Sequence, residues 1–183
     1  MTALATPDVR LRDSLVETMS DFGEITQMHG SGFWHVGEGW PDTSEAGLPA
    51  LVADLCGFAD PERDLGDSLV HCDFYWITDG EPQQVIGFLA IRHSLNDFLL
   101  ELGGHIGYSV RPAARGRGHA TRALALALDR AAELGIDRAL VTCDFDNEPS
   151  RRTIERNGGV YEDRRADKLR YWIDTTARGH SGR

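Results

Sequence analysis

Hydrophobic and polar residues follow two different spacings along the chain, and the order of these patterns predicts an α/β protein. Apolar residues recur at the spacing of a helix face in four segments, which we assign as helices: residues 13–22, 43–57, 118–134 and 147–159. Runs rich in aromatic and β-branched residues have strand length and predict strands in 9–11, 72–78, 83–95, 105–112, 137–145 and, as a pair, 160–174. We therefore expect a mixed central sheet of six to seven strands with helices on both faces.

The connections between these elements indicate how the strands pair. The runs on either side of residues 79–82 are separated only by a turn sequence, Asp-Gly-Glu-Pro, which predicts an antiparallel hairpin. The helix at 118–134 lies between two strands and is closed by Gly135. A strand, a helix and a strand in direct succession predict a βαβ unit with two parallel strands.

Length and composition agree with one folded domain. The chain has 183 residues, of which 41% are hydrophobic and 26% charged, enough to bury a core without disulfides or structural metal. We expect a single domain over residues 1–183, with its core at about 9–174 and a frayed tail at 178–183.

Charge and cysteine content narrow the classes of partner. The net charge of −10 disfavours nucleic acid and mildly favours a cationic small molecule. The three cysteines form neither a metal-binding pattern nor a disulfide framework, which is typical of a reducing compartment. Neither a signal peptide nor an apolar run of membrane-spanning length is apparent. We therefore expect a cytoplasmic protein with no bound metal and no membrane contact.

The segment VRPAARGRGHA places glycines and arginines directly before a helix. A helix start leaves about four backbone N–H groups unpaired and carries the positive end of the helix dipole. Gly116 and Gly118 let an anion approach these donors, and Arg115 and Arg117 can add charge-assisted contacts. The segment lacks the third glycine of a dinucleotide fingerprint and the Gly-Lys-Ser/Thr of a P-loop. It predicts a phosphate site, with a tight strand-to-helix turn as the alternative.

This segment resembles motif A of the GNAT N-acetyltransferases, V-x-P-x-x-[QR]-x-x-G-x-[GA], which runs from a strand into a helix. Its fixed positions are occupied here by Val110, Pro112, Arg115, Gly118 and Ala120. The order of elements over residues 9–174 is also similar to that of a complete GNAT domain. The sequences GGHIGYSVRP and CDFDNEPSRRTIERNGG resemble a subgroup of acetyltransferases whose acceptors are unassigned.

The resemblance implies a set of residues that bind acetyl-CoA, the cosubstrate of the family. The pyrophosphate is then expected at Arg115, Gly116, Arg117, Gly118, His119 and Ala120, and the pantetheine arm along Tyr108, Ser109 and Val110. Asn147 and Ser150 match the start of a further family motif and imply contacts with the pantetheine. For Asn147, capping of the following helix is the alternative.

The catalytic groups are less well defined. Glu101 and His105 lie near the start of the motif A strand, where many relatives keep a general base. The alternative for Glu101 is a solvated carboxylate in a linker, and the alternative for His105 is a structural histidine. Relatives often carry a tyrosine as the acid where this chain has Ile154. Without that tyrosine, the proton for the thiolate of CoA would have to come from Tyr108 or a water. Alternatively, the thiolate leaves without a proton, since a thiol has a pKa of about 8.5. Cys143 suggests either a covalent acetyl-enzyme or simple packing.

We therefore expect an N-acetyltransferase that acts on the primary amine of a small molecule by direct attack, the usual route of the family. Two alternatives stand beside it: a silent acyl-CoA-binding module, suggested by Ile154, and a protein or peptide N-acetyltransferase, which needs an open groove near loop 28–42. Phe33, Trp34 and Trp40 in this loop either line a ligand cleft or cover the core. Asp144 either holds a cationic acceptor or closes a turn. A homodimer is compatible with the resemblance.

Overall fold

Seven strands form one mixed sheet in the computed structural model, which describes residues 1–23, 28–35 and 40–178. Their spatial order is β1-β2-β3-β4-β5-β7-β6. Only β4 and β5 are parallel among neighbouring strands of this described sheet; the other neighbours are antiparallel. The strands are β1 (Ala3–Ala5), β2 (Cys72–Asp79), β3 (Gln84–Arg92), β4 (Ile106–Val110), β5 (Arg138–Asp144), β6 (Val160–Arg165) and β7 (Lys168–Asp174). The predicted hairpin, βαβ unit and final strand pair are confirmed.

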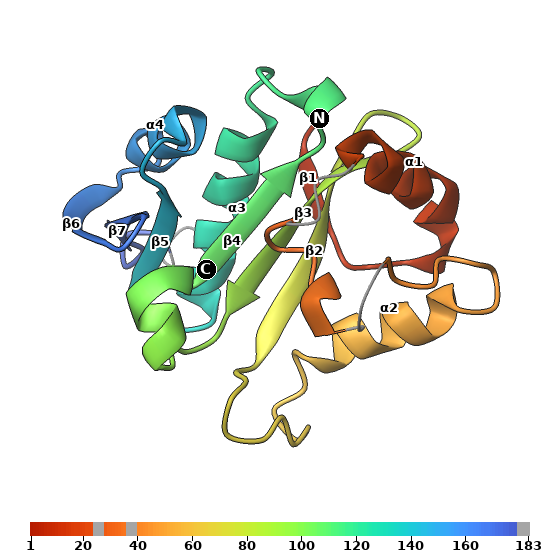
Figure 1. The fold of residues 1–183 in the computed structure, drawn as a ribbon, viewed down its shortest axis with the longest axis horizontal. Coiled ribbons are helices and arrows are strands. Elements are labelled where there is room, and N and C mark those ends of the chain that lie inside the picture. Colours follow the sequence, from red (N-terminus) through yellow and green to blue (C-terminus); the bar gives the residue numbers. More distant parts are fainter. Residues whose placement is uncertain (24–27, 36–39, 179–183) are drawn as a thin grey trace.

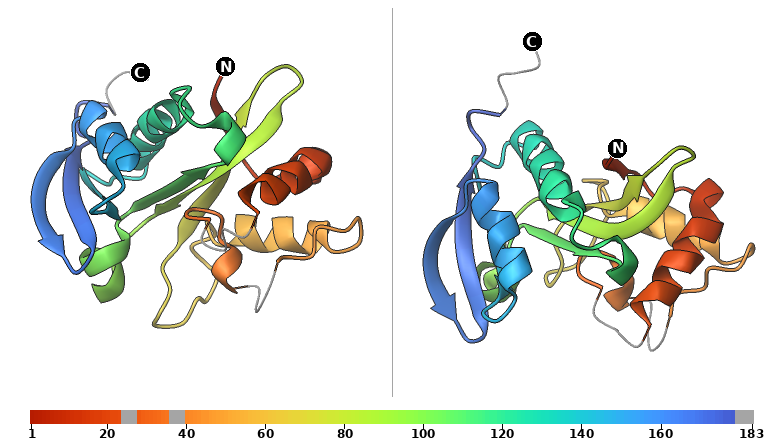
Figure 2. Two further views of the ribbon diagram at one scale, coloured as in Figure 1. Left: turned by 45° about the horizontal axis from the view of Figure 1, so that its top comes forward. Right: turned by 90° about the horizontal axis from the view of Figure 1, so that it is seen from above.

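Helices cover both faces of this sheet (Figures 1 and 2). The α-helices are α1 (Arg12–Phe22), α2 (Leu48–Gly57), α3 (His119–Glu133) and α4 (Glu148–Arg156). α1 and α2 share a core with Phe74 and Phe88 of the sheet, and α3 and α4 share a separate core with Ile91 and Val141. The predicted mixed sheet with helices on both faces is therefore confirmed.

Helix α3 follows the predicted apolar face closely. Its fully buried residues are Ala123, Leu124, Ala127, Leu128 and Ala131. Gly118 before the helix and Gly135 after it have φ values of +82° and +77°, a left-handed conformation that glycine adopts without a steric penalty. The helix spans all but the end residues of the predicted 118–134 segment.

Local polar contacts overturn two predictions near the amino terminus. Residues 9–11 form a 3₁₀ turn rather than an edge strand, because the Asp8 carboxylate accepts a hydrogen bond from the Arg10 N–H at 2.8 Å and turns the chain. The edge strand is β1, which pairs with β2. Helix α2 begins at Leu48 rather than near residue 43, because the Ser44 hydroxyl accepts from the Gly47 N–H in a preceding turn. Between β3 and β4 the chain includes a π-helical turn, Leu99–Gly103.

Candidate active site

The parallel strands β4 and β5 separate soon after they meet. They are paired at Ile106 and Val141, although both strands continue beyond this point. The residues after the junction, including Gly107 and Tyr108 of β4 and Thr142 of β5, line a cavity of about 600 Å³. Backbone groups along the separated edge of β4 are therefore available to an extended ligand, as at the exposed edge of any sheet.

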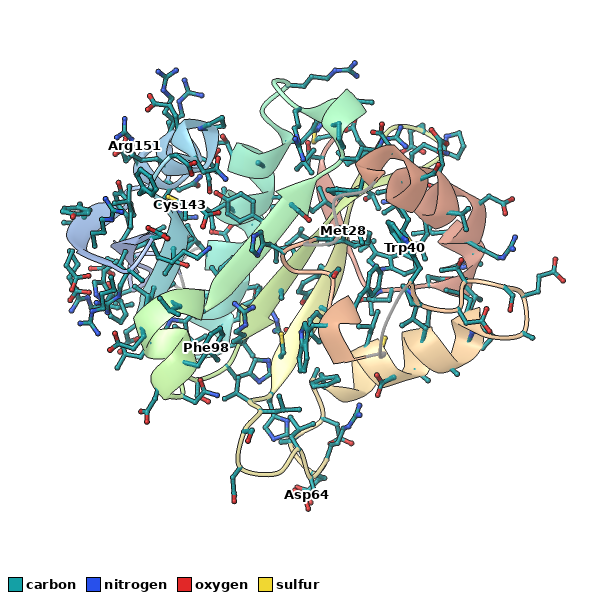
Figure 3. The ribbon with its side chains drawn as sticks, viewed as in Figure 1. Met28, Trp40, Asp64, Phe98, Cys143 and Arg151 are labelled. Carbon is teal, nitrogen blue, oxygen red and sulfur yellow. The ribbon has the colours of Figure 1, made fainter. Side chains whose placement is uncertain are left out.

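The other walls of this cavity come from segments far apart in the sequence. Figure 3 shows Met28, Phe98 and Cys143 around β4, and all three line the cavity. Phe33 is buried against Phe88, with ring centroids 5.2 Å apart, whereas Trp34 lies at the wall with 60% of its surface exposed. Both alternatives considered for the aromatic loop therefore occur: Phe33 covers the core, and Trp34 lines the cavity.

Tyr108 and Ser150 meet inside this cavity. Their hydroxyl groups are 2.9 Å apart, and either oxygen can donate. Burial raises the pKa of Tyr108 to about 12, which keeps the phenol protonated at neutral pH. Ser150 lies in the first turn of α4, where its N–H donates to the Asn147 side chain at 3.1 Å. Asn147 thus caps the helix and also lines the cavity.

Ile154 has no access to the cavity. Its side chain is fully buried in the core that α3 and α4 share with the sheet. Position 154 therefore belongs to the hydrophobic core and not to the cavity wall. On that wall, the phenol nearest to α4 is that of Tyr108.

The loop before α3 leaves the start of the helix open. Gly116 and Gly118 both have positive φ, and a Cβ built at either position meets no atom within 4 Å. Among the described residues, no side chain caps the start of α3, so the N–H groups of its first turn are available to a ligand. Arg117 is exposed beside them. This arrangement fits a pyrophosphate, because unpaired donors and the positive end of the helix dipole coincide.

Four neighbouring positions hold this region together. The Arg115 Nε donates to the Val110 carbonyl at 2.9 Å and so ties the loop to the end of β4. The Ser109 hydroxyl donates to the His29 carbonyl at 2.8 Å, which joins β4 to the aromatic loop. The ring of His119 lies within hydrogen-bond distance of the Thr2 hydroxyl, at 2.8 Å. Ala120 packs against the core beneath α3.

His105 and Glu101 lie outside this cavity. His105 is 8% exposed, its ring Nδ1 accepts from the Leu140 N–H at 2.9 Å, and burial lowers its pKa to about 4. Glu101 forms an ion pair with Arg165. Because neither side chain reaches the cavity wall, the geometry does not support either one as the general base, and we do not propose them for that role.

His29 is a cavity residue that the sequence reasoning missed. Partial burial lowers its pKa below the ordinary 6.5, and the charge of Lys168 lowers it further, while Asp144 raises it. The imidazole is therefore neutral at pH 7 and can accept a proton. It stands in an irregular glycine-rich loop with neither periodicity nor a motif, so the sequence carries no signal for its role.

The charged residues of the cavity differ from the expected cation-binding site. Asp144 is paired with Lys168, whose Nζ lies 2.5 Å from the carboxylate. Arg92 also lines the cavity and donates through Nη1 to the carbonyls of Gly103 and Gly104, both at 3.1 Å. Asp144 is the only carboxylate among the described residues of this wall, and it is already neutralised.

Cys143 is a buried thiol on the cavity wall. Burial and the adjacent Asp144 raise its pKa to about 11. A thiol with this pKa stays protonated at neutral pH and is a poor nucleophile. Within the described residues, no group of three or more histidine, cysteine or acidic side chains is placed to hold a metal ion.

The sequence matches the family model of the acetyltransferase (GNAT) domain over residues 18–160. The chain therefore belongs to the GNAT N-acetyltransferases, acyltransferases that use acetyl-CoA. No protein of curated function matches it at a significant level. No helix in the described part of the chain combines the length and apolar character that a membrane span requires.

Solved structures support the same fold. RimJ of Mycobacterium smegmatis, in complex with CoA-disulfide, has a TM-score of 0.67 at 19% identity, covering 98% of this chain and 85% of that one. The ribosomal-protein-S5-alanine acetyltransferase of Vibrio fischeri has a TM-score of 0.66 at 13% identity, covering 96% and 93%. MccE, the microcin C7 self-immunity acetyltransferase in complex with acetyl-CoA and AMP, has a TM-score of 0.62 at 16% identity, covering 94% and 92%.

Proposed function

We propose that this GNAT enzyme transfers an acetyl group to the primary amine of a small molecule by direct attack, in the cavity between β4 and β5. The observation that carries the proposal is the separation of these strands beside the open start of α3. The β4 edge at residues 108–110 suits an extended pantetheine chain, and residues 115–120 suit its pyrophosphate. Asn147 and Ser150 would close the site from α4.

Three side chains account for the proton movements. Acetyl-CoA, when bound, supplies the acetyl group as a thioester. Tyr108, protonated up to about pH 12, would give its proton to the departing sulfur, with Ser150 holding the phenol in place. His29, neutral at pH 7, would accept the proton of the amine directly or through a water.

The state of Cys143 supports direct attack. An acetyl-enzyme would require a thiolate, and the raised pKa of this buried thiol, about 11, disfavours that form. Cys143 is then a packing residue of the cavity wall. The acetyl group would pass to the amine in a complex that holds both substrates.

Acetylation of a protein amino terminus is a second candidate function. One structural neighbour is named for it, RimL, a ribosomal L7/L12 alpha-N-protein acetyltransferase, and another is named as a ribosomal-protein-S5-alanine acetyltransferase. An acyl-CoA-binding module without turnover is the third, and the buried Ile154 motivates it.

One experiment separates these functions. Release of free CoA is measured with acetyl-CoA and a panel of small amines and amino-terminal peptides, together with calorimetric binding of acetyl-CoA. We expect release with small amines and its loss in Tyr108→Phe. Binding without release on any acceptor would instead support the silent module, and release with peptides alone would support protein acetylation. A protein that does not bind acetyl-CoA contradicts all three.

A further inference from the structure

Arg92 lies where two cavities meet. Its side chain lines the cavity between β4 and β5 and also a second, adjoining cavity of about 230 Å³. Burial lowers the pKa of its guanidinium, which nevertheless stays charged at neutral pH. The protein thus holds a permanent cation at the junction of two cavities.

No carboxylate in the described part of the chain pairs with this cation. Arg92 bonds only backbone carbonyls there, those of Gly103 and Gly104, through the single atom Nη1. The adjacent Asp73 is held by His93 and Arg130, at 2.8 and 2.9 Å. Arg92 is partly buried, and a partly buried charge without a counter-ion is destabilising, so a ligand that supplies one gains binding energy.

The guanidinium is positioned close to the proposed reaction centre. A Cβ built on Gly107 would lie 3.5 Å from its Nη1 and 3.6 Å from its Nη2, so the guanidinium lies over β4 at that residue. Gly107 immediately precedes Tyr108, the proposed proton donor. Tyr108 and Arg92 both line the cavity between β4 and β5, so an anionic group bound to Arg92 would lie in the same cavity as the proposed reaction centre.

The second cavity is apolar. Arg92 is its only charged lining residue among the described ones, and most of its walls are hydrophobic side chains: Trp34, Phe58, Leu69, Val70, Phe74 and Phe98. Its volume of about 230 Å³ accommodates a large aliphatic or aromatic side chain. The cavity between β4 and β5, the Arg92 guanidinium and the second cavity together suit a ligand with an amine, an adjacent anion and an apolar group.

We propose that the acceptor is a free α-amino acid with an apolar side chain, its carboxylate on Arg92, its side chain in the second cavity and its amine toward Tyr108. A guanidinium binds a carboxylate through two parallel hydrogen bonds, and one carbon separates that carboxylate from the amine. A peptide amino terminus lacks the carboxylate at this distance. The assignment rests on the proposed function and specifies its substrate class.

The transfer step uses the groups already described. The amine nitrogen forms a bond to the acetyl carbon, and the carbon–sulfur bond breaks. One amine proton passes to His29, and the departing sulfur takes the proton of Tyr108. The amine reacts in its neutral form, and the products are an N-acetyl amino acid and free CoA. Solvent then carries the proton from the His29 imidazolium back to the Tyr108 phenolate, which restores the enzyme and balances atoms and charge.

The first test uses the unmodified protein. Release of CoA is compared for phenylalanine, phenylalaninamide and phenethylamine, which differ only in the carboxyl group. We expect kcat/KM about 10- to 100-fold higher for phenylalanine, the value of a charge-assisted hydrogen-bonded pair. Equal or better turnover of the amide overturns the assignment of Arg92 and leaves the proposed function standing. Failure to release CoA with any amine overturns both.

The second test removes the charge. Arg92→Met should raise the KM for phenylalanine about 10- to 100-fold and leave phenylalaninamide unchanged, because the amide never used the guanidinium. Arg92→Lys should recover part of the preference. Arg138→Met is the matched control, since Arg138 is exposed at the start of β5, at the opposite end of the strand from its cavity residues. An equal loss for acid and amide in Arg92→Met would show a purely structural role and overturn the assignment.

The apolar cavity is tested separately with Val70→Phe, which narrows it. We expect the KM for phenylalanine to rise relative to that for alanine, whose methyl group does not need the space. Equal effects on both amino acids would contradict the placement of the acceptor side chain.

Discussion

The hydroxyl groups of Tyr108 and Ser150 lie 2.9 Å apart, one on β4 and the other in the first turn of α4. Their contact links β4 to the start of α4 beside the separated strands. The position at which relatives often carry a tyrosine holds Ile154, which is fully buried. The phenol of Tyr108, on β4, therefore lies beside α4 in place of a tyrosine from the helix itself. This placement supports Tyr108 as the acid.

Tyr108→Phe tests this role directly. Loss of a general acid should lower kcat about 100-fold, with little change in the KM for acetyl-CoA, since only the proton donor is removed. Because the pKa of Tyr108 is raised from 10.0 to about 12, the donor form persists below that pH, and its titration should cause no loss of activity up to pH 10. Tyr161→Phe, at an exposed position on β6, serves as the control. An unchanged kcat in Tyr108→Phe would exclude the phenol as the acid.

Gly118→Ala separates ligand binding from backbone strain. A methyl group there occupies the open space above the first-turn N–H groups, so the Kd for acetyl-CoA should rise about tenfold, or about 1.4 kcal/mol. The left-handed conformation should also cost about 1 kcal/mol of folding stability.

The matched control is Gly135→Ala, because this glycine has a similar φ of +77° and equally open surroundings at the other end of α3. It should lose the same stability in urea unfolding without any change in the Kd measured by calorimetry. Equal affinity losses in both variants would argue against a pyrophosphate site at Gly118.

His29 should set the acidic limb of the pH profile. Its pKa lies below 6.5, and the neutral imidazole is the active base, so kcat/KM should be retained at pH 7 and fall as the pH drops through that lowered pKa. In His29→Gln the rate should be about 100-fold lower at pH 7 and this limb should vanish. A variant that keeps the limb would assign the titration to another group.

Ile154→Tyr should not restore a proton donor. The site is fully buried, and the Ile154 Cγ2 lies 2.5 Å from where a Cβ on Gly159 would stand, so a larger polar ring should cost about 1–3 kcal/mol of stability without raising kcat. Ile154→Val should cost about 0.5–1.5 kcal/mol and leave kcat unchanged. Urea unfolding and the CoA-release assay measure the two effects, and a higher kcat in Ile154→Tyr would contradict this view.

Local patterns in the sequence were enough for the elements that pack over a long apolar face. Helix α3 and the strands on either side of it lie within a residue or two of their predicted ranges, because burial of a regular stripe leaves few alternatives. Residues 9–11 were assigned wrongly, because a single side-chain contact from Asp8 outweighs the weak strand pattern of three residues.

Some residues of the candidate site can likewise be recognised from local sequence, whereas others cannot. The proposed phosphate loop at 115–120 is contiguous in the sequence, so its glycines and the following helix start predict it without tertiary information. For His105, proximity to motif A says nothing of where the ring lies, and in the fold the ring is buried against β5 and β7. His29 and Arg92 carry no motif.

The sequence by itself determined the family, the order of the elements and the loop that suits a pyrophosphate, because each depends on residues close together along the chain. Only the tertiary structure decided where β4 and β5 separate, that Tyr108 meets Ser150, and that Arg92 stands at the junction of two cavities. These relationships join residues about 40 or more positions apart, or depend on the packing of whole elements. Local spacing cannot specify them, because folding alone brings such residues together.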